Sequence, residues 1–230
     1  MGRVAQQRTS QRLEQLLGEV DAYLAEEQPE LTAEAHESGV AVRGKLVIAD
    51  AEGPIDAYDI KMGVPASFPT DEPLVWEVGG RILRMADHHV FESSERCCLG
   101  VWEAWLARTQ DPSFAAFMRG PVRDYFLGQS LVAVGEDWPY GELSHGPAGV
   151  LQAYGEALGI EADETTVRSY LVILSLSQVK GHHPCPCGSG LRLRKCHQGK
   201  VRNLSTRIDS DLANRMLKRL TWQSASAAAQ

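Results

Sequence analysis

The sequence lacks any apolar run long enough to cross a bilayer, which takes about 20 helical residues. The apolar stretch from Leu171 to Leu174 ends at Ser175. The N-terminus, MGRVAQQRTSQR, is polar and contains no apolar signal-peptide core. We therefore expect a cytoplasmic protein that makes no membrane contact.

The sequence also lacks scattered cysteines. Its five cysteines form two clusters, Cys97–Cys98 and the group Cys185, Cys187 and Cys196. In a cytosolic chain, clustered thiols bind metals or act in catalysis more often than they form disulfides. The 230 residues are 43% apolar and 23% charged, which is typical of a globular protein with one large domain, or one ordinary domain and a small module. We find no internal repeat.

The charge is distributed unevenly along the chain. The net charge is -7, yet residues 179–222 carry ten Lys or Arg against two acids, leaving 13 bases against 28 acids elsewhere. An acidic body thus carries a basic C-terminal part. Such a part can contact nucleic acid or the ribosome, or can be an ordinary docking surface. It lacks the interleaved aromatic residues that single-strand binders use for stacking.

Residue patterns predict an α+β protein with an antiparallel sheet of about four strands packed with helices. Strands are expected at 40–49 and 55–62, joined by a turn at 50–54, then at 74–78 and 81–85. The pattern of residues 27–38 predicts no definite element. Residues 64–73 contain three prolines and are expected to form an extended loop. Helices are expected over six segments: 8–26, 102–108, a short one within 111–124, 147–158, 165–178 and about 205–220.

The strongest chemical motif is HHPCPCGSGLRLRKCH, which begins at His182. It offers three thiolates and one imidazole, a closed tetrahedral set of the kind that structural zinc prefers. The glycines on either side of Ser189 permit the tight turn that brings these ligands together. Because no position is left open for substrate, we expect Zn²⁺ to stabilise the fold of this segment and take no part in catalysis. The expected ligands are Cys185, Cys187, Cys196 and His197.

Over residues 183–198 the motif resembles SEC-C, the small zinc module at the C-terminus of the SecA translocase and of many bacterial proteins. The resemblance rests on the CPCGSG core, the basic stretch and the final Cys-His pair. It implies zinc on the same four ligands and a docking or adaptor role. His182 and His183 are then not zinc ligands, and we expect them to be exposed to solvent.

The stretch DHHVFESSERCCL, residues 87–99, has two interpretations. Its cysteines are either half-buried structural thiols, since free Cys behaves as a small hydrophobe, or they include a nucleophile displayed after a polar loop. His88 and Cys98 are ten residues apart, and Leu99 follows. Spacing therefore favours Cys98 as the nucleophile and leaves Cys97 as a buried neighbour.

The order of these features resembles ubiquitin-conjugating enzymes over residues 8–160. In that family a helix and antiparallel strands lead to a proline-rich loop, for which ASFPTDEP is the counterpart here, then to a His-Pro-Asn tripeptide ten residues before the active-site Cys-Leu. His88, His89 and Val90 occupy the tripeptide's places. The stretch FLGQS to GVLQAYGEALG is similar to bacterial relatives of these enzymes.

The resemblance implies a conjugating-enzyme-like acyltransferase that carries a thioester on Cys98, with His88 or His89 supplying a donor. The implied partners are a ubiquitin-like protein, an activating enzyme, a protein target and a JAB-type deconjugating metalloprotease. One residue departs from the pattern, because Val90 cannot act as the family's asparagine does. The expected divisions are a conjugating domain (1–160), a connecting helix (161–180), a zinc module with a basic helix (181–222) and a disordered tail (223–230).

Two readings stay open. The chain is either this enzyme or a non-catalytic adaptor whose zinc module docks to a protein, a ribosome or a nucleic acid. The stretch DWPYGELSHGPAG, residues 137–149, is either a connector whose Trp138 and Tyr140 pack on the core, or a source of a base or amine-positioning group at the thiol. Asp137, Glu142 and His145 are the candidates for that group.

Overall fold

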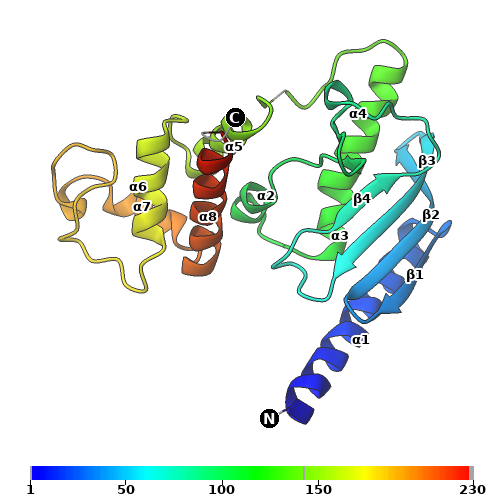
Figure 1. The fold of residues 1–230 in the computed structure, drawn as a ribbon, viewed down its shortest axis with the longest axis horizontal. Helices are drawn as coiled ribbons and strands as arrows, with labels where there is room; N and C mark the ends of the chain where they lie inside the picture. The colour runs from blue at the N-terminus through cyan, green and yellow to red at the C-terminus, as the bar shows by residue number, and fades with distance from the viewer. Residues whose placement is uncertain (1, 142, 228–230) are drawn as a thin grey trace. The chain divides into compact units, whose positions relative to one another are not determined.

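The computed structural model describes residues 2–141 and 143–227, without the side chains of residues 2–9 and 222–227 (Figure 1). By their internal contacts the residues divide into two compact units. The first comprises Met1–Gly100 and Asp111–Gly141, and the second Val101–Gln110 and Glu142–Gln230. The predicted domain of residues 1–160 therefore spans parts of both. Within the described residues, none of the helices is both long and apolar enough to traverse a lipid bilayer.

The first unit is an antiparallel four-stranded sheet with helices, in the strand order β1-β2-β3-β4 (Figure 1). Its long N-terminal helix contacts β1 and β2, and α4 contacts β2 and β3. The elements are α1 (Gly2–Glu27), β1 (Leu31–His36), β2 (Gly39–Asp50), β3 (Gly53–Pro65), β4 (Leu74–Glu77), a 3₁₀ turn (Ala86–His88), β5 (Val90–Phe91), β6 (Arg96–Cys97), α3 (Phe114–Phe117), a π-helical turn (Met118–Val122) and α4 (Arg123–Ala133). This confirms the predicted α+β class and the sheet of four antiparallel strands.

One face of the sheet forms the core of the first unit. Alternate residues of neighbouring strands lie directly opposite each other, as in the pairs Val42–Met62 and Leu46–Tyr58, and all four side chains are buried. Helix side chains complete the packing: the Phe126 ring of α4 lies 4.9 Å from the Tyr58 ring, centroid to centroid. In β3 every second residue from Tyr58 to Val64 is buried, whereas Ile55, expected on the apolar face, is 45% exposed.

Two expectations about the sheet need correction. The fourth strand of the sheet is β1, which lies within residues 27–38, where the sequence predicts no definite element. Residues 81–85, predicted to be a strand, form bends instead. Arg81 explains the difference, because its guanidinium binds both carboxylate oxygens of Asp56 at 2.7 and 2.9 Å and lies 4.5 Å above the Tyr58 ring. These side-chain contacts tie the segment to β3 without a backbone ladder.

The second unit is helical. Its elements are α2 (Trp102–Arg108), α5 (Pro147–Leu158), α6 (Glu164–Leu174), a 3₁₀ turn (Leu193–Lys195), α7 (Gln198–Leu204) and α8 (Ser210–Ala227). As predicted, Pro147 opens α5 and Gly159, in the left-handed conformation, ends it. The predicted helix 165–178 ends earlier, at Leu174. The basic helix predicted at about 205–220 begins later, as α8 at Ser210, and a separate short helix, α7, precedes it. The residues expected to be a disordered tail are helical to Ala227, and 228–230 lie outside the described residues.

Candidate thiol and metal sites

The Cys97–Cys98 pair lies at the end of a two-stranded hairpin in the first unit. Val90 pairs with Cys97, and Phe91 pairs with Arg96. Successive side chains of a strand point to opposite faces, so the two thiols face different surroundings. Cys97 is 3% exposed, whereas Cys98 is half-buried. Of the two thiols, only that of Cys98 is open to a reagent.

The surroundings of Cys97 keep its thiol protonated. Burial raises the pKa of Cys97 to about 11, against an opposing hydrogen bond with the Tyr125 hydroxyl. Since the thiolate is the reactive form, Cys97 is inert near neutral pH. The geometry thus gives Cys97 the role of structural neighbour, the role that spacing alone assigns to it.

The histidine pair forms the turn that leads into this hairpin. His88 ends the 3₁₀ turn, and His89 follows in the left-handed conformation with φ 52°. The backbone N–H of Cys98 donates to the His89 carbonyl at 2.7 Å. The main chain therefore brings together the two segments that sequence spacing links.

Two side chains of α4 hold this turn. The Gln129 Nε2 donates to the His88 carbonyl at 2.7 Å, and the Tyr125 hydroxyl donates to the same oxygen at 3.4 Å. Both side chains are buried. No sequence pattern marks Gln129, because its partner is a backbone atom 41 residues earlier.

The start of the Pro/Gly-rich connector packs on the same turn. The Trp138 ring lies 4.2 Å from the His89 ring and 6.1 Å from the Tyr125 ring, centroid to centroid. Gly128 makes room for it, since a Cβ there would meet the indole at 2.5 Å. These contacts agree with the reading of Trp138 as a packing residue.

Among the described residues, neither Asp137 nor His145 forms a hydrogen bond or ion pair with the thiol. Asp137 is exposed, with no hydrogen bond or ion pair among the described residues. Glu142 lies outside the described residues, and His145 is an exposed residue of the second unit. Cys98 follows β6 directly, and α2 begins four residues later.

The four predicted metal ligands come together in the second unit. The ligand atoms of Cys185, Cys187, Cys196 and His197 all lie within 4.8 Å of one another. Adjacent Sγ atoms are 3.4 Å apart for Cys185–Cys187 and 3.6 Å apart for Cys187–Cys196, and the His197 Nδ1 is 3.3 and 3.2 Å from the Sγ atoms of Cys185 and Cys196. A disulfide needs an S–S distance of about 2.05 Å, so the thiols are free and spaced as the corners of a small tetrahedron.

A short loop brings the first two ligands to the last two. The Cys185 N–H donates to the Leu191 carbonyl, and the Leu193 N–H donates to that of His183, both at 2.8 Å. Gly188 and Gly190 turn the chain at φ 76° and 74°, where a side chain would be strained. The predicted need for glycine on either side of Ser189 is therefore met.

The donor chemistry suits a metal ion. Hydrogen bonds from Ser189 lower the pKa of Cys187 to about 6, so the thiolate that a metal requires forms near neutral pH. His182 and His183 stack on each other with centroids 5.0 Å apart and are not members of the ligand group. The fit of three thiols and one imidazole supports a metal site.

Comparisons with known proteins identify no relative. No protein-family model, curated protein or solved structure matches the chain at a significant level.

Proposed function

We propose that the protein is a conjugating-enzyme-like acyltransferase that carries a ubiquitin-like protein as a thioester on Cys98. The observation that carries this proposal is the pairing of one accessible thiol with a histidine turn, joined by the 2.7 Å hydrogen bond from Cys98 to His89. Gln129 holds that turn from α4, so the loop beside the thiol is preorganised.

The order of elements supports the proposal. An N-terminal helix is followed by four antiparallel strands, a loop with Pro69 and Pro73, and then the histidines and cysteines. This is the order that the resemblance to ubiquitin-conjugating enzymes implies. The finer assignment of that fold is part of the proposal.

The proposed chemistry is two acyl transfers. In the first, the Cys98 thiolate attacks the thioester between the ubiquitin-like protein and an activating enzyme; a new C–S bond forms, and the activating enzyme's thiolate leaves. In the second, an amine of the target attacks the carbonyl, the C–S bond to Cys98 breaks, and the amine's proton passes to a base. His88 and His89 are our candidates for that base or for a donor to the developing oxyanion.

Val90 sets this chain apart from the family pattern. It is 5% exposed and pairs with Cys97 inside the hairpin, so it fills an apolar position. An asparagine side chain there would bury an amide. The second transfer therefore proceeds without that amide, and the imidazoles are the remaining side-chain donors of the turn.

We also propose that the cluster of Cys185, Cys187, Cys196 and His197 holds a structural Zn²⁺. Four protein ligands complete its shell, so the ion would stabilise the loop and leave no position for substrate. The proposed partners follow: an activating enzyme, a ubiquitin-like protein, a target and a JAB-type protease that reverses the reaction.

The test is intact mass after incubation of the full chain with an activating enzyme, ATP and the cognate ubiquitin-like protein. We expect an adduct that a reducing agent releases, that the Cys98→Ala variant does not form and that the Cys97→Ala variant does form. An adduct on the Cys98→Ala variant would overturn the assignment.

The second candidate function is a non-catalytic adaptor, and Val90 is the observation that favours it. Here the first unit binds a protein and the basic zinc module docks to another protein, a ribosome or a nucleic acid. Normal function after replacing both Cys97 and Cys98 by alanine decides for the adaptor. Binding through phosphate would weaken steeply with added salt.

A further inference from the structure

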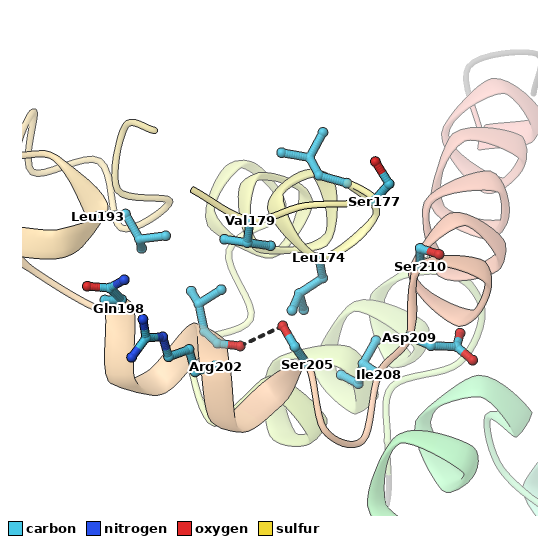
Figure 2. A pocket seen from close by; sticks show the side chains of 12 residues that line it. Leu174, Ser177, Val179, Leu193, Gln198, Arg202, Ser205, Ile208, Asp209 and Ser210 are labelled. Carbon is cyan, nitrogen blue, oxygen red and sulfur yellow. Dashed lines mark hydrogen bonds between the residues drawn. The ribbon is translucent and has the colours of Figure 1, made fainter. Parts of the chain in front are cut away.

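The second unit contains a groove that neither the thiol nor the metal explains. Its volume is about 370 Å³, and it lies where the end of α6, residues 176–179, the turn at Leu193, α7 and the start of α8 meet (Figure 2). Figure 2 shows Leu174 and Val179 on one side of this space. Arg202 of α7 and Ser205, which follows the end of α7, lie on the other side. A cavity of this size accommodates one or two large side chains of a partner.

The floor of the groove is aliphatic. Leu174, Leu193, Val201 and Ile208 line it and are at most 3% exposed, while Leu176 at the mouth is 37% exposed. The Ser205 hydroxyl donates to the Val201 carbonyl at 2.9 Å, so its proton is already used within α7 (Figure 2). A floor of this kind favours an apolar side chain over a polar one.

The mouth of the groove is cationic. Arg202 lines it and is exposed, and its guanidinium forms no hydrogen bond or ion pair within the residues that the structure describes. Exposed Lys180 follows the lining residue Val179. The one acid of the lining, Asp209, accepts the Leu212 N–H at 2.7 Å at the N-terminus of α8, which compensates its charge.

We propose that this groove binds a protein segment in which a large aliphatic side chain lies beside carboxylates. The aliphatic group fills the floor, and a carboxylate pairs with Arg202 at the mouth. The lining contains no aromatic ring on which a base can stack, which disfavours single-stranded nucleic acid. All lining residues belong to the second unit, so binding at this groove requires no thioester on Cys98.

The experiment selects 12-residue peptides from a random library on the full chain loaded with zinc. We expect selected peptides to place Leu or Ile within three residues of Asp or Glu. Their affinity, measured by fluorescence anisotropy, should fall at least tenfold with Leu176→Asp and with Arg202→Glu. Both residues are exposed, and circular dichroism verifies that the variants fold.

Matched controls locate the effect. Leu191→Asp replaces an exposed leucine outside the groove, and Lys218→Glu reverses an exposed charge on α8; each should change affinity less than twofold. Three results would overturn the proposal: selected peptides without enriched acids, equal losses in the control variants, or displacement of the peptide by single-stranded RNA or by a fatty acid.

Discussion

The backbone N–H of Cys98 donates to the carbonyl oxygen of His89 at 2.7 Å, which fixes the half-buried thiol against the histidine turn. Cys97, one residue earlier, points the opposite way into the core. The hairpin thus gives two chemically identical side chains different exposure, one half-buried and one buried.

The two thiols should differ in alkylation rate. With a pKa of about 11, Cys97 is about one part in a thousand thiolate at pH 8, and it is buried as well. Iodoacetamide should modify Cys98 at least tenfold faster, as measured by peptide mass spectrometry on the zinc-loaded protein. The Cys97→Ser variant should still be alkylated rapidly at Cys98, and the Cys98→Ser variant should lose this rapid alkylation. Equal rates for the two native thiols would contradict this arrangement.

Replacing Val90 by asparagine should destabilise the first unit and not improve catalysis. Val90 is 5% exposed, and burying an amide without a partner costs about 1–3 kcal/mol. Urea unfolding, followed by hydrogen exchange in the hairpin, measures the loss. The control is Val78→Asn, because Val78 is 55% exposed and should tolerate the change. Faster aminolysis by the Val90→Asn variant would contradict this expectation, because it would show that the asparagine amide assists the reaction.

Acid should weaken the link between Arg81 and β3. Hydrogen bonds from Arg81 lower the pKa of Asp56 below its ordinary value of about 3.9. A carboxyl group whose folded-state pKa is lowered stabilises the fold above its unfolded-state pKa, and this stabilisation is lost as pH falls through the folded-state pKa.

The Asp56→Asn variant should therefore be less stable than the parent near neutral pH, and the difference should shrink below about pH 4. Urea unfolding at several pH values, read from hydrogen exchange in β3, measures it. Asp21→Asn, at an exposed site on α1, serves as the control. Its free energy of unfolding should change with pH in the same way as that of the parent. A difference between Asp56→Asn and the parent that is constant across pH would exclude this role for the ion pair.

Metal removal should unfold the loop of residues 183–197. We expect about one equivalent of zinc per chain, lost in Cys185→Ser and Cys196→Ser but kept in Cys98→Ser. After chelation, the amides of Cys185 and Leu193, which now bond across the loop, should exchange faster. Elemental analysis and hydrogen exchange measure these effects; unchanged exchange after the metal is removed would mean that the loop folds without it.

The parts of this structure that sequence predicts are those whose signals are local. The burial alternation of β2 and β3, the Pro147 and Gly159 ends of α5 and the spacing of the four metal ligands all follow from neighbouring residues. Strand β1 carries no such signal, because it has one fully buried residue, Leu31.

Long-range side-chain contacts explain the remaining differences. Residues 81–85 are predicted to form a strand, yet Arg81 binds Asp56, 25 residues away, and the segment stays irregular. The support of the His88 carbonyl by Gln129 is hidden for the same reason, since it joins a side chain to a distant backbone oxygen. Sequence thus predicts the clustering of the four candidate metal ligands better than it predicts the distant contacts that hold the histidine turn.

The discontinuity of the two units has a consequence for how the chain is made. Helix α2 is synthesised between the two parts of the first unit, yet its Glu103 pairs with Arg219 at 2.8 Å, 116 residues later. During translation the buried side chains of Ala104 and Ala107 complete their packing only after both α5 and α8 have left the ribosome. A product released early would display this apolar surface, which is what chaperones and proteases recognise. The late partner of α2 thus makes exposure of that surface a signal that synthesis is incomplete.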